Sequence, residues 1–130
     1  MKFSQQTIQQ MIDEYLEIDD CEAKSRAFFI YNFSESHNIY AQGCRLENGE
    51  YEVEMTGEDY LLSPESLGET GTAYLESLGW EEGPAGNFVC ILNRTKFENG
   101  DAANLILNSL RAYDLLPNDF DSSGYDIMDF

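Results

Sequence analysis

The fold is decided by the stretch IYAQGCRLENGEYEVEM, residues 39–55. Two β-favouring segments flank Asn48-Gly49, and an Asn-Gly pair between such segments is the strongest short-range signal for a β-hairpin. The second segment alternates glutamate with the apolar residues Tyr51, Val53 and Met55. Because successive side chains of a strand point to opposite sides, this pattern predicts a half-buried strand with one face in water. The stretch therefore predicts two adjacent antiparallel strands.

The segments on either side of this hairpin extend the predicted sheet. Residues 27–33 are aromatic and β-favouring, and a polar turn at 34–38 joins them to the hairpin. Three strands in an antiparallel meander follow directly. Residues 87–92, with the sequence NFVCIL, follow a Gly-Pro-Ala-Gly turn and predict a further strand.

Helical patterns stand at both ends of these strands. Residues 4–18 carry one apolar stripe at helical spacing, formed by Ile8, Met11, Ile12, Tyr15 and Leu16. Residues 99–116 predict the last helix, which Pro117 ends.

A third helix is expected between the meander and the fourth strand. Ser63-Pro64-Glu65 has the capping side chain, the first-turn proline and the acid that are typical of a helix start. Gly68 and Gly71 each weaken a helix, so its firm part is expected at 72–78, with Gly79 as the C-terminal stop.

These patterns predict an α+β protein with an antiparallel sheet of about four to five strands flanked by helices, in the order α-β-β-β-α-β-α. The chain of 130 residues has the size of one domain. We expect a single domain over residues 1–117 and an acidic C-terminal tail over 118–130, a segment without apolar periodicity.

Charge narrows the possible partners. The chain has 25 Asp and Glu against seven Lys and Arg, which gives a formal net charge of −18 at pH 7. Nucleic acids and anionic membrane surfaces repel such a chain, so neither is an expected partner. The N-terminus lacks the apolar stretch of a signal peptide, and the apolar runs are too short to span a bilayer. We therefore expect a cytoplasmic protein that binds another protein.

The sequence carries no signature of an enzyme or of a cofactor. Cys21, Cys44 and Cys90 are odd in number and widely spaced, which predicts reduced thiols and no disulfide framework. His37, the only histidine, falls in a predicted turn and is expected to be a surface residue. No Gly-rich phosphate loop is present. We expect a protein that is not an enzyme and has no cofactor.

One acidic segment resembles the start of a calcium-binding loop. Residues 119–124 match the first six positions of an EF-hand loop, including its glycine. The match then fails, because Asp126 occupies the apolar eighth position and Phe130 the twelfth, where a bidentate glutamate belongs. We expect no tight calcium site, although weak cation binding is compatible with Asp119, Asp121, Asp126 and Asp129.

The same tail supplies the candidate binding residues. Aspartates alternate there with apolar side chains, a composition suited to docking on a basic and apolar surface. The candidates are Phe120, Tyr125, Ile127, Met128 and Phe130. The alternative is an ordinary frayed terminus, or a strap that packs on its own domain.

A resemblance to a known family rests on Leu75-Glu-Ser-Leu78-Gly79-Trp80, followed by Pro84 and Asn87-Phe88. This pattern resembles the type III secretion chaperone-like superfamily, particularly its bacterial TY-Chap-type members. The order of elements over residues 4–116 is also similar to that fold. The local interpretation of the same residues is structural, with Gly79 as a helix cap, Trp80 as a core anchor and Asn87 as a turn residue.

The resemblance implies a twisted sheet flanked by helices and a homodimer that holds an extended client segment over exposed apolar surface. The function expected first is therefore a non-enzymatic, secretion-chaperone-like binding module. The alternative is an immunity or antitoxin-type inhibitor that covers the basic active site of a toxic enzyme, as the charge and the acidic tail suggest.

Overall fold

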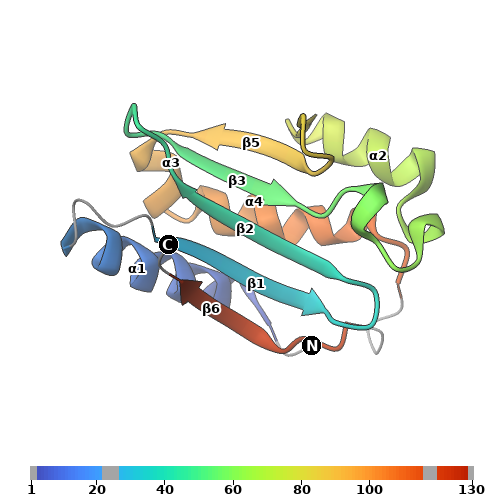
Figure 1. Ribbon diagram of the computed structural model, residues 1–130, viewed down its shortest axis with the longest axis horizontal. Coiled ribbons are helices and arrows are strands. Elements are labelled where there is room, and N and C mark those ends of the chain that lie inside the picture. Colours follow the sequence, from blue (N-terminus) through green and yellow to red (C-terminus); the bar gives the residue numbers. More distant parts are fainter. Residues whose placement is uncertain (1–2, 22–26, 116–119, 129–130) are drawn as a thin grey trace.

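The computed structural model describes residues 3–21, 27–115 and 120–128, and it is built around one six-stranded antiparallel sheet (Figure 1). The strand order is β4-β5-β3-β2-β1-β6. In chain order the elements are α1 (Gln5–Cys21), β1 (Phe28–Ser34), β2 (Ile39–Arg45), β3 (Tyr51–Met55), η1 (Glu58–Tyr60), η2 (Pro64–Ser66), α2 (Gly68–Ser77), β4 (Glu81–Glu82), β5 (Phe88–Leu92), α3 (Arg94–Glu98), α4 (Asp101–Ser109), η3 (Leu110–Ala112) and β6 (Gly124–Met128).

The predicted α+β class and the meander are confirmed. Strands β1, β2 and β3 pair in sequence order, and β5 adds on the far side of β3. The Asn48-Gly49 turn closes with a hydrogen bond of 2.7 Å from the Leu46 N–H to the Glu50 carbonyl. Gly49 has φ of +88°, a conformation that favours glycine.

The sheet has six strands in the described residues, against the four to five that the sequence predicted. The additional strands are β4, which has only two residues, and β6, which lies in the segment expected to be a tail without regular structure. A short helix, α3, was also missed. The Asn93 side chain caps this helix by accepting a hydrogen bond from the Lys96 N–H at 2.9 Å. Its five residues are too few to show a helical period.

One face of the sheet packs against the helices and forms the core. Helices α1, α3 and α4 contact one another on that side, and Figure 1 shows these three helices behind the strands. At the centre the rings of Tyr51 and Phe97 stack with centroids 4.2 Å apart and planes at 1°. Tyr15 meets Phe29 edge to face at 5.3 Å. Aromatic pairs of these geometries add to the stabilisation that burial alone gives.

The turn after α2 confirms the structural roles expected for its residues. Gly79 ends the helix region with φ of +104°. The Trp80 side chain is 1% exposed, and its indole N–H donates a hydrogen bond of 2.7 Å to the Ser109 hydroxyl of α4. Asn87 is more than a turn residue, because its buried amide accepts from the Gly57 N–H at 2.9 Å and donates to the Tyr40 hydroxyl at 3.1 Å. Trp80 and Asn87 therefore connect the α2–β5 segment to the rest of the fold.

Helix α2 starts earlier than the firm segment 72–78 that the sequence predicted. A Cβ atom at Gly71 would lie 2.3 Å from the Ala112 carbonyl oxygen. The glycine that weakens the helix therefore permits the close packing of α2 on η3, and this contact stabilises the first turn.

The end of α1 is held by ion pairs. The buried Asp19 carboxylate lies 3.2 Å from the Arg45 guanidinium at the end of β2. Burial raises the pKa of Asp19, and the neighbouring Arg45 partly opposes this rise. Asp20 forms two hydrogen bonds of 2.9 Å with Arg94, which lowers the pKa of Asp20. No helix in the described ranges has the length and apolar character needed to span a membrane.

The burial of Trp80 makes a direct prediction about stability. Trp80→Ala should lower the free energy of unfolding by about 3–5 kcal/mol, because it opens a large cavity and leaves the Ser109 hydroxyl without its indole partner. Trp80→Phe, which keeps most of the ring volume, should cost clearly less. Denaturant titration followed by circular dichroism measures both. An Ala variant as stable as the parent protein would contradict the buried position.

Candidate functional site

The second face of the sheet is turned away from the described helices, and we call it the open face. Its side chains alternate along each strand with those of the core. They are Phe28, Ile30, Asn32, Tyr40, Gln42, Cys44, Glu52, Glu54, Val89, Ile91, Asp126 and Met128. Most are half-buried by their neighbours, and Ile91 and Met128 are each 44% exposed.

Strand register arranges these side chains in rows that cross the sheet. One row runs from Met128 through Phe28, Cys44 and Glu52 to Ile91. The next runs from Asp126 through Ile30, Gln42 and Glu54 to Val89. Each row has a glutamate on β3 and an apolar side chain on β5 and on β1, whereas the β6 position is Met128 in the first row and Asp126 in the second. The open face therefore offers apolar surface that is interrupted by carboxylates.

All charged groups that the described strands place on the open face are acidic. They are Glu52, Glu54 and Asp126, with Glu81 of β4 opposite Val89 at the edge. Partial burial raises the pKa of Glu52, and repulsion by Glu54 raises it further. Glu54 accepts a hydrogen bond of 2.8 Å from the Gln42 amide, whereas Glu52 has no basic side chain beside it in the described strands. A cation placed over β3 would relieve this repulsion.

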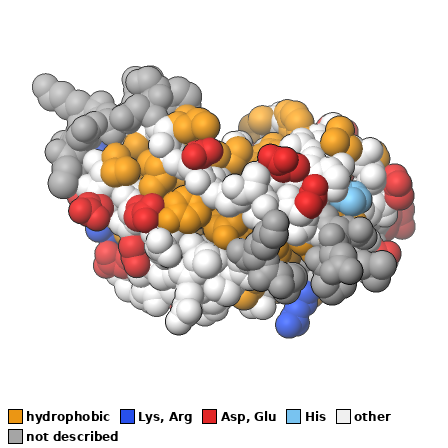
Figure 2. Space-filling view, turned by 90° about the horizontal axis from the view of Figure 1, so that it is seen from below, with side chains coloured by type: hydrophobic (Ala, Val, Ile, Leu, Met, Phe, Trp, Pro, Cys, Tyr) orange, Lys and Arg blue, Asp and Glu red, His pale blue; other side chains and the backbone are white. Residues whose placement is uncertain are grey.

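The two edges of the sheet differ. Strand β4 is two residues long and consists of glutamates, and short charged edges resist pairing with other chains. Strand β6 has five residues and pairs with β1 along one side only. The side of the molecule that carries β6 shows hydrophobic side chains in a band with acidic side chains among them (Figure 2). The β6 edge is therefore the longer and less protected of the two.

Strand β6 is fastened at its start by Asp121. The carboxylate accepts hydrogen bonds from the Ser34 hydroxyl at 2.8 Å, the Ser36 hydroxyl at 2.9 Å and the Ser36 N–H at 3.2 Å. These bonds lower the pKa of Asp121 to about 2. Because they join the β1–β2 turn to the residues before β6, they hold the last strand in register.

The structure separates the residues that the sequence grouped as a binding segment. Phe120 is half-buried and meets Phe3 edge to face at 5.8 Å. Tyr125 and Ile127 lie on the helix side of β6 and pack on the core, with the Tyr125 ring 5.6 Å from that of Tyr31. Met128 lies on the open face. Phe130 lies outside the described residues.

Sequence patterns alone do not mark Ile30, Val89 or Ile91, which lie on this face. The strands at 27–33 and 87–92 are apolar on both faces, so alternation could not mark one side as open. The glutamates of residues 51–55 were the available signal, because their strand has a clear wet face.

The groups with catalytic or metal-binding chemistry are not assembled in the described residues. His37 lies in the β1–β2 turn as predicted, with its Nδ1 atom 3.0 Å from the Ser36 hydroxyl and 3.2 Å from that of Ser34. Asp121 bonds the serines rather than the imidazole, which differs from a triad in which the acid orients the histidine. Cys44 lies at the opposite end of β2 from His37, and burial with nearby Glu52 raises the pKa of its thiol.

The EF-hand-like segment does not form a loop around a common point. Asp121 is engaged by the β1–β2 turn, whereas Asp126 lies in β6 opposite Ile30. Asp119 and Asp129 fall outside the described residues. No group of three or more potential metal ligands occurs in the described part of the chain.

Comparisons of the chain with protein-family models, with curated proteins and with solved structures return no match. The class of protein that the structure defines is therefore stated from its geometry alone: a six-stranded antiparallel α+β sheet with helices on one side and an acidic, apolar face on the other.

The Asp121 contacts predict how β6 is anchored. Asp121→Ala should increase hydrogen exchange of the β6 amides, because the three bonds to the β1–β2 turn are lost. Glu47→Ala, which removes another exposed acid in the β2–β3 turn, is the matched control.

The pH dependence has a definite sign. The pKa of Asp121 is lower in the folded protein than its ordinary value of 3.8, so the anchor is complete above that value and is lost as the pH falls through about 2. Amide exchange rates of β6, measured by NMR, should therefore differ less between Asp121→Ala and the parent protein as the pH falls through this range. A β6 strand that exchanges equally in both proteins at neutral pH would contradict the anchor.

Proposed function

We propose that this protein is a non-enzymatic binding module that holds an extended, basic and apolar segment of another protein against the open face and the β6 edge. The observation that carries the proposal is the chemistry of the open face, where exposed Ile91 and Met128 lie in rows and the only charged groups that the described strands place on this face are carboxylates. A segment that alternates apolar and basic side chains complements both features.

Apolar burial supplies the affinity in this proposal. Ile91 and Met128 are each 44% exposed, and Ile30 and Val89 are half-buried in the neighbouring row. Covering such side chains removes apolar surface from water, which stabilises the complex by roughly 25 cal/mol for each square ångström of apolar area. The carboxylates favour a basic partner, because an acidic segment would be repelled by Glu52, whose pKa is already raised by burial and by repulsion from Glu54.

The free side of β6 offers backbone hydrogen bonds to an extended segment. A strand added at a sheet edge gains main-chain hydrogen bonds, and its alternate side chains contact the two faces of the sheet, which gives specificity. Asp126 is the middle residue of β6, so a basic side chain beside it would be favoured.

A second copy of this chain is less suited to the same edge. A symmetric antiparallel pairing that overlapped all five residues of β6 would place Asp126 opposite Asp126, and like charges in directly opposed positions are destabilising. Each copy also carries a formal net charge of −18. The homodimer that the resemblance implies would therefore need another surface, and sedimentation or light scattering measures whether one forms.

The alternative function, an inhibitor of a basic toxic enzyme, rests on the same acids. Its distinguishing property is kinetic: electrostatic steering makes association fast at low salt and slower as salt rises. Apolar holding of a client segment tolerates salt, because burial rather than charge drives it. The secretion-chaperone-like function is the first choice because the open face combines apolar rows with the acids.

A substitution on the open face tests the proposal. The probe is a nine-residue peptide that alternates valine with lysine, compared with one that alternates valine with glutamate, and binding is measured by fluorescence anisotropy. Met128→Gln should weaken binding of the lysine peptide about tenfold, because Met128 lies on the open face of the edge strand and an exposed apolar side chain is replaced by a polar one of similar size.

Leu62→Gln is the matched control, since Leu62 is 68% exposed in the loop between η1 and η2. It should leave the affinity unchanged. Equal affinities of the Met128→Gln variant and the parent protein would overturn the open-face site. A third peptide, which alternates serine with lysine, distinguishes the two functions. The inhibitor would be favoured if this peptide bound as tightly as the valine–lysine peptide and if binding of both disappeared as the salt concentration rose.

A further inference from the structure

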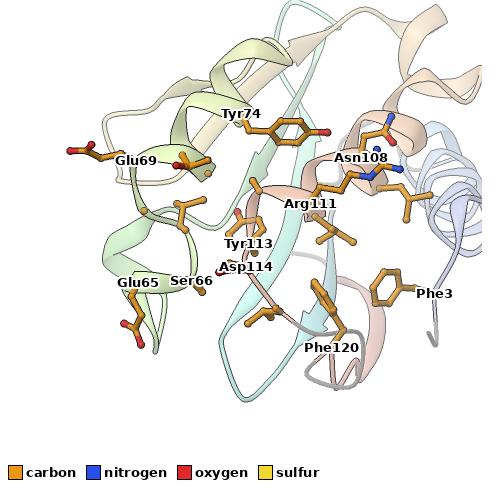
Figure 3. Close-up of a pocket in the computed structure, with 18 residues that line it drawn as sticks. Phe3, Glu65, Ser66, Glu69, Tyr74, Asn108, Arg111, Tyr113, Asp114 and Phe120 are labelled. Carbon is orange, nitrogen blue, oxygen red and sulfur yellow. The ribbon is translucent and has the colours of Figure 1, made fainter.

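A pocket distinct from the open face lies where α2 and η2 meet the end of α4 and η3 (Figure 3). Its volume is about 890 Å³, within the range of roughly 300–1,000 Å³ that is usual for small-molecule sites. Much of the lining is apolar. The apolar residues that matter are Leu67, Tyr74, Leu107, Leu110, Leu115 and Phe120. Four of them, Tyr74, Leu107, Leu115 and Phe120, are only partly buried and so leave apolar surface within the pocket.

Polar donors gather at one end of this pocket. Arg111 and Asn108 lie three residues apart where α4 continues into η3, so their side chains are neighbours on the same surface. Figure 3 shows both on the same side of the cavity, with the Tyr74 hydroxyl directed toward that side from α2. Arginine, the asparagine amide and the tyrosine hydroxyl can all donate hydrogen bonds to an anion.

Arg111 is unusual among the arginines of the described residues. Arg45 pairs with Asp19 at 3.2 Å, and Arg94 pairs with Asp20 and Glu98 at 2.9 Å each. Arg111 has no ion pair in the described part of the chain, although acids outnumber bases 25 to seven. A guanidinium fork is therefore available at the edge of an apolar cavity.

The acids on the pocket lining do not occupy the same end. Glu65 and Glu69 point out of the cavity, away from the side that carries Arg111 (Figure 3). Asp114 is exposed, and its backbone N–H bonds the Ser66 carbonyl at 2.6 Å, which places its backbone beside η2. These three carboxylates disfavour a ligand of high negative charge. A ligand with one negative charge and an apolar body suits this pocket, because the charge can meet the donors, the body can contact the apolar walls, and a single charge limits repulsion by the acids.

We propose that this pocket binds a linear monocarboxylate amphiphile, with its hydrocarbon chain along the leucines and its carboxylate on Arg111, Asn108 and Tyr74. Arginine suits this head group because its planar fork bonds a carboxylate through two parallel N–H groups. No residue given for the open face lines the pocket, so this site is independent of the proposed protein-binding function. Salt screens the repulsion between the carboxylate and exposed acids of the protein that lie more than about 8–10 Å away. The overall negative charge therefore weakens the direct contact between the carboxylate and Arg111 only a little.

The test follows the methyl NMR signals of Leu107, Leu110 and Leu115 during titration with octanoate, decanoate and dodecanoate below their micelle concentrations. Decanoate should shift these methyl signals. The affinity should rise about threefold to fourfold for each added methylene, because each is buried in the pocket. Decylamine, which has the same chain length and the opposite charge, should bind these residues at least about tenfold more weakly than decanoate.

Arg111→Gln should weaken decanoate binding at least about tenfold and should leave the fold intact, because the Arg111 side chain is exposed. Lys96→Gln removes one exposed positive charge from α3 and is the matched control, with no expected change in affinity. The proposal would be overturned by methyl shifts that are absent or occur elsewhere, by equal binding of decylamine, or by a decanoate affinity that Arg111→Gln and Lys96→Gln reduce to the same extent.

Discussion

The packing of aromatic rings between the sheet and the helices determines how the rest of the molecule is arranged. Tyr51 and Phe97 stack with centroids 4.2 Å apart, and Tyr15 packs edge to face on Phe29. These contacts fix which side of β1 and β3 faces α1 and α3. Since side chains alternate along a strand, a slip of one residue would bring Glu52 and Glu54 into this aromatic layer. The composition of the open face is therefore a consequence of the aromatic core.

The negative charge of the chain is distributed in a way that distinguishes three kinds of surface. At the end of α1, Asp19 and Asp20 are neutralised by Arg45 and Arg94, so acids there serve the fold. On the open face Glu52 and Glu54 have no basic neighbour in the described strands, and the pKa of Glu52 is raised. At the pocket, Arg111 has no ion pair in the described part of the chain, although Glu65, Glu69 and Asp114 also belong to the lining. A partner protein and a small anion would therefore recognise different regions of one acidic molecule.

The C-terminal segment connects these surfaces. Asp121 bonds the β1–β2 turn, Tyr125 packs against Tyr31 below the sheet, and Met128 extends the open face. Phe120 lines the pocket and also touches Phe3. The alternation of aspartate and apolar residues in this segment matches a strand with one face on the core. The sequence allows a strap that packs on the domain as one alternative, and the structure places residues 124–128 in the sheet itself.

The sequence by itself determined the elements that local patterns specify. The glutamate alternation of residues 51–55, the apolar stripe of α1 and the Gly79-Trp80 helix end all have their predicted positions, because each depends on neighbours within a few residues. Only the tertiary structure decided that β6 pairs with β1, since Tyr31 and Tyr125 meet across 94 positions of the chain. It also decided which faces of β1 and β5 are open, because their apolar sequences give no alternation to read. The pocket beside Arg111 belongs to the same category, since its walls combine residues of η2, α2, α4 and η3 with Phe3 and Phe120, which no local pattern brings together.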